Sequence, residues 1–113
     1  MSLDISLCMN KCPHCGRADE VFSANITQNL NKMAYGAGIY AILWRPEYNG
    51  IEKAEQLIEP LRKAIAEMKA NPARFKKHNS HNGWGLYEHF LPWLARLLEA
   101  CVLYPEASVD ASR

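Results

Sequence analysis

The stretch Ser2-Leu3-Asp4-Ile5-Ser6-Leu7-Cys8-Met9-Asn10-Lys11-Cys12-Pro13-His14-Cys15-Gly16 contains the two patterns that decide the fold. In its first half, Leu3, Ile5 and Leu7 alternate with polar residues, which is the period of a β-strand with one buried face. Its second half holds three of the four cysteines of the 113-residue chain. The sequence therefore predicts a strand that leads directly into a cysteine-rich clip at residues 8–16.

The clip predicts a zinc site. Cys12 and Cys15 are separated by two residues, with proline and glycine around them, and this spacing is typical of the tight knuckles that bind Zn²⁺. Cys8 supplies a third thiolate. Because zinc would fix the register of a hairpin too short to be stable alone, we interpret the metal as structural. Thiols that bind no metal, or that form a redox pair, are the alternatives.

The fourth zinc ligand is not set by the spacing of the thiols. Zinc ribbons usually carry a second Cys-x-x-Cys about 15 to 20 residues after the first, and the sequence has none. We take Cys101, the remaining cysteine, as the fourth ligand. The other candidates are His14, Asp19, His78, His81 and His89. A site with three protein ligands and a water would instead resemble a catalytic zinc.

Length and charge bound the class of protein. A chain of 113 residues and 12.8 kDa fits a single domain that spans residues 1–113. The net charge of +1 gives no overall attraction to nucleic acid or to an acidic membrane. The start of the chain lacks a signal-peptide pattern, and no apolar stretch approaches the ~20 residues that span a bilayer. We therefore expect a cytoplasmic protein with no membrane segment.

Apolar periodicity predicts the elements that follow the clip. Residues 21–24 are short and β-prone, so residues 2–24 read as a hairpin with the clip at its tip. A first helix is expected to begin near Asn25 and to end at Gly36 and Gly38. Next come a short buried helix at 39–44 and a long helix at 51–70 with a kink at Pro60. One helical turn is predicted at 72–75, and a last helix, which contains Pro92, at 86–103. The tail at 107–113 either adds an edge strand or stays loose. The sum is an α+β domain, in which a small antiparallel sheet packs against about three helices.

Two polar segments predict a ligand site. The first follows the predicted hairpin, and the second is the irregular segment 76–85, which presents histidine, asparagine and a tryptophan between glycines. The predicted ligand-binding residues are Asn25, Gln28, Asn29, His81, Asn82 and Trp84. Most of these side chains are amides, which recognise a ligand by hydrogen bonds without supplying a base. No nucleophile with a recognisable motif accompanies the histidines, so binding is favoured over catalysis.

A series of basic residues gives an alternative function. It comprises Arg62, Lys63, Lys69, Arg74, Lys76 and Lys77. With Phe75 and Trp84 nearby in sequence, this 62–77 face could combine phosphate contacts with base stacking. Four glutamates between residues 52 and 67 balance the charge, and such a pattern is more typical of the solvated side of an amphipathic helix.

Several short phrases occur together and carry a resemblance. They are Asn25-Ile26-Thr27 with Asn29-Leu30, Met33-Ala34, Ala37-Gly38-Ile39-Tyr40, Leu43-Trp44-Arg45-Pro46-Glu47, Leu57-Ile58-Glu59-Pro60-Leu61 and Asn82-Gly83-Trp84-Gly85. Together they cover most of residues 20–113, and the chain resembles a family of small uncharacterised proteins encoded by bacteriophages and prophages. In that family the phrase at 25–30 commonly reads Asn-Ile-Thr-His-Asn-Leu. Here Gln28 stands where the histidine would be, so an amide replaces a titratable group.

The resemblance implies a phage setting, and therefore the cytoplasm of a host cell. We interpret the protein as a non-enzymatic phage accessory protein that binds a host protein or a small polar ligand, with counter-defence as one plausible use and with zinc in a structural role. The alternative is a zinc-dependent or nucleic-acid-binding factor that uses the 62–77 face. The sequence leaves open whether the protein forms a homodimer.

Overall fold

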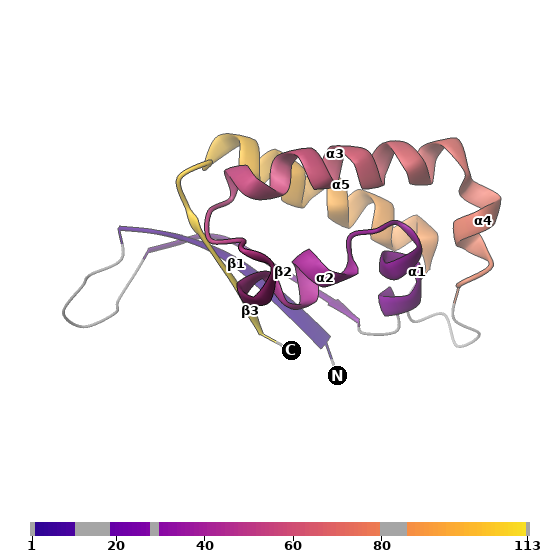
Figure 1. Ribbon diagram of the computed structural model, residues 1–113, viewed down its shortest axis with the longest axis horizontal. Helices are drawn as coiled ribbons and strands as arrows, with labels where there is room; N and C mark the ends of the chain where they lie inside the picture. Colours follow the sequence, from indigo (N-terminus) through magenta and orange to yellow (C-terminus); the bar gives the residue numbers. More distant parts are fainter. Residues whose placement is uncertain (1, 11–18, 28–29, 80–85, 113) are drawn as a thin grey trace.

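The computed structural model describes residues 2–10, 19–27, 30–79 and 86–112. It is an α+β fold, in which a three-stranded sheet lies under a layer of helices (Figure 1). The strands are β1 (Ser2–Met9), β2 (Asp19–Thr27) and β3 (Ser108–Ser112). The helices are α1 (Asn31–Gly36), α2 (Tyr40–Trp44), the 3-10 helix η2 (Pro46–Asn49), α3 (Glu55–Ala70), α4 (Pro72–Lys76) and α5 (Tyr87–Leu103). The predicted fold class is confirmed.

The sheet is antiparallel, with the strand order β2-β1-β3. Leu3 pairs with Ile26 of β2, and Leu7 pairs with Val109 of β3, so the alternating apolar residues of β1 are continued on both neighbours. The predicted N-terminal hairpin and the predicted C-terminal edge strand are therefore both confirmed. Of the predicted clip at residues 8–16, residues 11–16 lie outside the described residues.

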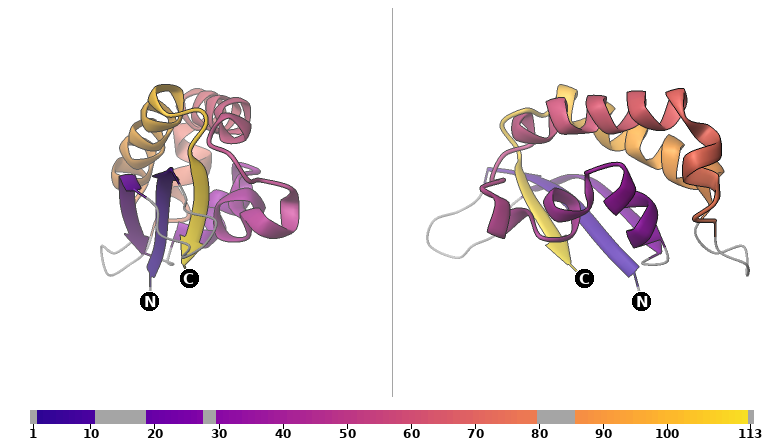
Figure 2. Two further views of the ribbon diagram at one scale, coloured as in Figure 1. Left: turned by 90° about the vertical axis from the view of Figure 1, so that its left-hand side faces the viewer. Right: turned by 45° about the vertical axis from the view of Figure 1, so that its right-hand side comes forward.

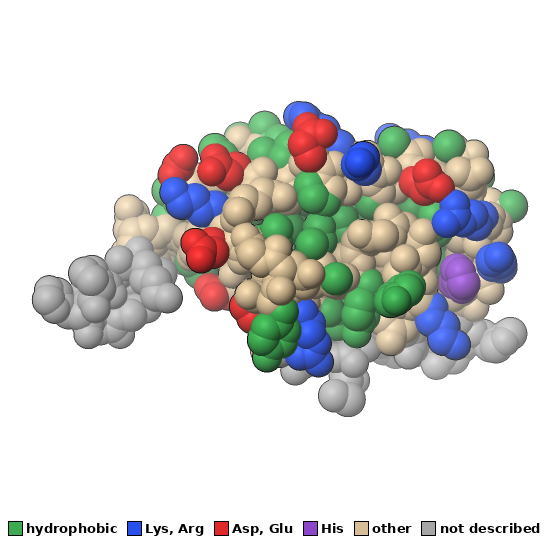
Figure 3. Space-filling model, in the orientation of Figure 1, with side chains coloured by type: hydrophobic (Ala, Val, Ile, Leu, Met, Phe, Trp, Pro, Cys, Tyr) green, Lys and Arg blue, Asp and Glu red, His purple; other side chains and the backbone are tan. Residues whose placement is uncertain are grey.

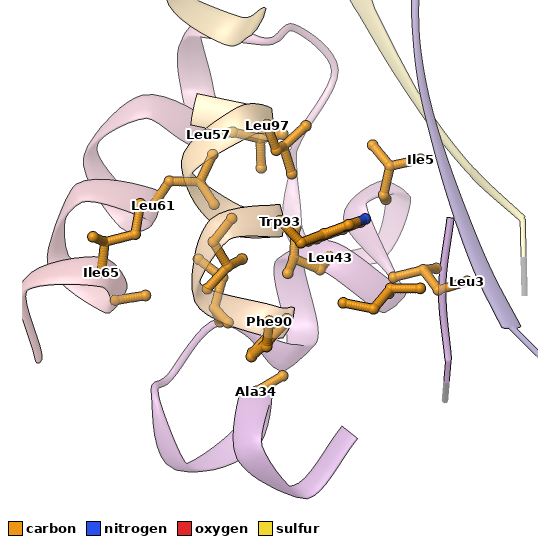
Figure 4. Packing of buried hydrophobic residues seen from close by; sticks show 14 of the residues in the cluster. Leu3, Ile5, Ala34, Leu43, Leu57, Leu61, Ile65, Phe90, Trp93 and Leu97 are labelled. Atoms are coloured by element: carbon orange, nitrogen blue, oxygen red, sulfur yellow. The ribbon is translucent and has the colours of Figure 1, made fainter. Parts of the chain in front are cut away.

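The apolar face of β1 forms the floor of the core. Leu3, Ile5 and Leu7 have no exposed surface, as alternation predicts for the covered face of a sheet. Figure 4 shows the ring of Trp93 on α5 between Leu43 of α2 and this face of β1. One hydrophobic cluster joins the sheet to every helix from α1 to α5, which is why short helices such as α1 are held in place.

The long helices α3 and α5 lie side by side above the sheet (Figures 1 and 2). Tyr87, at the start of α5, donates a hydrogen bond from its hydroxyl to the carbonyl oxygen of Met68 on α3 at 2.8 Å, and both groups are buried. Pro60 and Pro92 are accommodated within α3 and α5, which continue through them. None of the helices among the described residues is long and apolar enough to cross a membrane.

The prediction that a helix begins near Asn25 is wrong. Residues 25–27 belong to β2, and α1 begins only at Asn31. Asn25 does not cap a helix: its Nδ2 donates to Oδ1 of Asp4, its partner on β1, at 2.7 Å. The strand continues because Ile26 pairs with Leu3, so the length of β1 decides where β2 ends.

The expected start of the long helix at residue 51 is also wrong. The helix begins at Glu55, because the backbone before it forms hydrogen bonds with β3 and the residue that precedes β3. The amide of Val109 donates to the carbonyl oxygen of Glu52 at 2.9 Å, and the amide of Ala54 donates to the carbonyl oxygen of Ala107 at 2.8 Å. Gln56 then closes the turn. Its Oε1 accepts from the amides of residues 52 and 53, and its Nε2 donates to the carbonyl of residue 50.

Candidate functional site

Most of the predicted ligand site falls outside the described residues. Gln28 and Asn29 lie there, and so do His81, Asn82 and Trp84. Asn25 is exposed on β2, where its side chain is bonded to Asp4 on the face of the sheet opposite the helices. The joint site between the two polar segments therefore stays a prediction.

The described part of the predicted zinc site separates into two places. Cys8 is half-buried near the end of β1, and its carbonyl oxygen accepts from Oγ of Ser108 at 3.2 Å. Cys101 has no exposed surface, and burial raises the pKa of its thiol to about 12. Among the residues that the structure describes, no group of three His, Cys, Asp or Glu side chains is placed to hold a metal.

The remaining ligand candidates are dispersed or lie beyond the described ranges. Asp19 accepts a hydrogen bond from Nδ2 of Asn10 at 3.1 Å, and His89 is exposed on α5. Cys12, His14 and Cys15 are not described. A site at the clip with Cys8, Cys12 and Cys15 stays a prediction, and Cys101 would have to offer a thiolate from inside the apolar core to complete it.

A different face, built by the short helices, combines exposed aromatic rings with positive charge. Tyr35 on α1 and Tyr48 on η2 are each 74% exposed. The ring of Tyr40 lies between that of Tyr35, with centroids 5.7 Å apart, and that of the buried Trp44, stacked at 5.1 Å. The guanidinium of Arg45 lies 5.9 Å from the centre of the Tyr48 ring. We call Lys32, Tyr35, Tyr40, Arg45 and Tyr48 the tyrosine face.

The rings of Tyr35 and Tyr40 border a shallow hollow of about 220 Å³, which Gly38 and Ala41 also line. Gly38 has φ +73°, a left-handed conformation that favours glycine, and a side chain at this position would enter open space. The hollow is therefore open, with a bare backbone at Gly38 and aromatic rings beside it. Such a shape suits a protruding side chain of another protein better than a small enclosed ligand.

The short helices are joined to α4 by an arginine. Arg74 donates from Nη1 to Oε1 of Glu67 on α3 at 2.6 Å and from Nη2 to the carbonyl oxygen of Gly36 on α1 at 3.1 Å. A Cβ built on Gly36 would lie 3.7 Å from Phe75 and 3.8 Å from Nε2 of His78. The end of α1, within residues 30–46, and α4, within residues 71–79, therefore meet at one end of the molecule (Figure 1).

These two segments carry no acidic residue at all. Their basic side chains are Lys32, Arg45, Arg74, Lys76, Lys77 and His78. Figure 3 shows basic and histidine side chains gathered at this end, with hydrophobic side chains beside them over α1 and α2. Although the chain as a whole has a net charge of +1, this end of it is locally positive.

The basic series between residues 62 and 77 is only partly available to a partner. Arg62 forms an ion pair with Glu59 at 3.3 Å, and Arg74 forms one with Glu67. Both arginines are thus engaged on this protein's own surface. The four lysines of the series, Lys63, Lys69, Lys76 and Lys77, are exposed, and Nζ of Lys76 lies 5.5 Å from the centre of the Tyr87 ring, so positive charge is accessible here as well as on the tyrosine face.

Sequence reasoning missed the tyrosine face. The predicted helices at this position were judged by their apolar residues, and Tyr35 and Tyr48 do not share the buried side with Met33 and Leu43. One available signal was the absence of Asp and Glu between residues 30 and 46, a stretch that contains two tyrosines.

Comparison of the chain with protein-family models, with curated proteins and with solved structures finds no match.

Proposed function

We propose that this protein is a non-enzymatic accessory protein, of the kind encoded by bacteriophages and prophages, that binds a host protein through the tyrosine face. One observation carries the proposal. Tyr35 and Tyr48 each expose 74% of their surface, and the guanidinium of Arg45 lies 5.9 Å from the centre of the Tyr48 ring, whereas the aromatic residues of α5 up to Trp93 are buried. Exposed apolar groups grouped on one face are typical of protein interaction sites.

The residue types on this face are those that dominate the energetics of protein interfaces. Tyrosine and arginine are enriched among residues whose truncation costs most of the binding energy. Tyr40 is already held against Trp44 and Tyr35, so its ring loses little conformational freedom on binding. The face is thus preorganised in its centre and adaptable at its two exposed tyrosines.

The charge of the face specifies the partner further. Because residues 30–46 and 71–79 contain basic but no acidic side chains, a partner with an acidic surface is attracted and a basic one is repelled. Association with an acidic partner should slow as the salt concentration rises, since the charges are exposed and screened. A host protein with an acidic surface, in the cytoplasm of the infected cell, is therefore the partner class that we propose.

Quantitative cross-linking in host-cell extract tests the proposal. The wild-type protein is compared with Tyr35→Ala/Tyr48→Ala and with the control Tyr104→Ala, which removes an exposed tyrosine near the end of α5. We expect the double variant to capture at least about tenfold less partner than the wild type, which is the loss typical of hot-spot residues. The control should capture as much partner as the wild type. Equal capture by all three proteins would contradict the proposal.

The exposed ring of Tyr35 near basic side chains favours single-stranded nucleic acid as a second candidate partner, because bases stack on such rings while cations contact phosphates. Fluorescence anisotropy with short labelled DNA and RNA strands distinguishes the two. Binding that falls steeply with salt and disappears in Tyr35→Ala would replace the protein partner by nucleic acid.

A further inference from the structure

The sheet has two outer strands, and the fold protects them unequally. On the outer side of β3, Lys53 forms a bridge with Ser108, and the amide of Val109 is bonded to the carbonyl of Glu52 at 2.9 Å. On the opposite side, β2 pairs with β1 alone among the described strands. In Figure 2, left, β2 is the outermost strand, with no described element beside it in the plane of the sheet.

From Phe22 to Thr27, β2 lacks the features that discourage pairing at an edge, since its charged residues and its bulge lie at its start. Natural edge strands are often short or carry lysine or proline, whereas β2 has nine residues and contains neither. Its single irregularity lies near its start, where Leu7 pairs with Phe22 but Cys8 pairs with Glu20. From Phe22 to Thr27 the strand is in regular register with β1, so it offers a regular edge to a further strand.

The two faces of β2 are chemically distinct. Phe22 and Ala24 lie on the core face but are only half-buried, and none of the described strands covers their outer side, while Ile26 on the same face is buried. Ser23 and Asn25 point to the opposite face and are exposed. A strand with the same alternation would therefore extend both faces at once.

A second copy of β2 has that alternation, and its charges permit only one direction of pairing. The charged residues of the strand, Asp19 and Glu20, are both at its start. In antiparallel pairing the two acidic ends lie far apart, whereas parallel pairing would place them beside each other. With the two-fold axis at Ala24, Phe22 of each copy faces Ile26 of the other, and Ser23 faces Asn25.

We propose that the protein forms a symmetric homodimer through antiparallel pairing of β2 with β2 of a second copy. The result is one continuous sheet with the order β3-β1-β2-β2-β1-β3. An axis perpendicular to the sheet keeps the helices of both copies on the same side and the polar face of both on the other. Apolar pairs of Phe22 and Ile26 then cover the half-exposed edge of each core. The tyrosine face takes no part in this contact.

Sedimentation equilibrium from micromolar to millimolar concentration tests the dimer. The wild-type protein should pass from the monomer mass of 12.8 kDa to twice that value as its concentration rises. The variant Ser23→Lys/Asn25→Lys places lysine directly opposite lysine in the proposed register. We expect it to raise the dimer dissociation constant by about tenfold or more, because like charges that face each other across strands repel.

Three matched proteins make the result decisive. Ala95→Lys/Ser112→Lys adds the same charge at exposed positions on α5 and β3 and should dimerise as the wild type does. Tyr35→Ala/Tyr48→Ala should do so too, which separates this dimer from the proposed function. If circular dichroism shows that the double variant is unfolded, Ser23→Lys alone is used: it places the two lysines diagonally across the axis and should weaken the dimer in the same direction. A wild type that stays monomeric throughout, or equal weakening by β2 variants and control, overturns the proposal.

Discussion

At the scale of single residues, Cys101 shows how burial sets chemistry. The side chain has no exposed surface on α5, and desolvation raises the pKa of its thiol from 9.0 to about 12. At neutral pH the thiol is therefore protonated and packed as a small apolar group. To bind zinc, the Cys101 thiol would have to lose its proton inside the core. Burial opposes this loss unless the bound cation lowers the pKa of the thiol again.

The raised pKa predicts a specific dependence of stability on pH. The folded state holds the Cys101 proton more tightly than the unfolded state does, so this contribution is complete below pH 9 and is lost as the pH rises towards 12. We compare urea unfolding of the wild type with that of Cys101→Ala at increasing pH. The stability advantage of the wild type should be constant up to pH 9 and shrink above it. An advantage that does not change with pH would contradict the burial of the thiol.

At the scale of elements, Arg74 connects three helices. It binds Glu67 of α3 and the carbonyl oxygen of Gly36 at the end of α1, and its guanidinium lies 5.0 Å from the centre of the Phe75 ring on its own helix, α4. Arg62 is also paired with a glutamate, but within α3 and with both side chains more than half exposed. The two arginines thus form a natural comparison between an ion pair that joins elements and one that does not.

We expect Arg74→Ala to lower the free energy of unfolding by about 1 to 2 kcal/mol, because two charge-assisted hydrogen bonds are lost at a half-exposed site. Arg62→Ala should change it by less than about 0.5 kcal/mol, since exposed pairs within one helix contribute little. Chemical denaturation of both variants measures the difference. Equal losses would show that Arg74 acts only as a surface charge and does not hold α1 against α4.

The elements also show what could be predicted from the sequence. The alternation of Leu3, Ile5 and Leu7 is a local property, and it correctly predicted β1 and its buried face. The starts of α1 and α3 were misplaced because backbone pairing with distant strands decided them. Asn25 has the chemistry of a helix cap, yet pairing with Asp4 keeps it in β2. The exposure of Tyr35 likewise depends on how α1 sits against its neighbours, which no local pattern contains.

At the scale of the whole molecule, the described residues form one continuous core. Buried residues run from Leu3 on the first strand to Val109 on the last, and one cluster joins the sheet to the helices. A metal at residues 8–16 would therefore fix the hairpin tip of a domain that already has a core, in contrast to small zinc domains that unfold without metal. Because the core is this large, we expect the loss of zinc to loosen the hairpin without unfolding the whole domain.

We expect protein purified without chelators to carry one zinc ion, and Cys12→Ser to carry none. Since Cys8 near the end of β1 is the described thiol of the clip, metal loss should weaken protection of the amides in β1 and β2 near the clip, while α3 and α5 keep theirs. Native mass spectrometry gives the metal content, and hydrogen exchange locates the change. A wild type without zinc would contradict the predicted zinc site, and global unfolding of Cys12→Ser would show that the clip, rather than the core, holds the sheet and helices together.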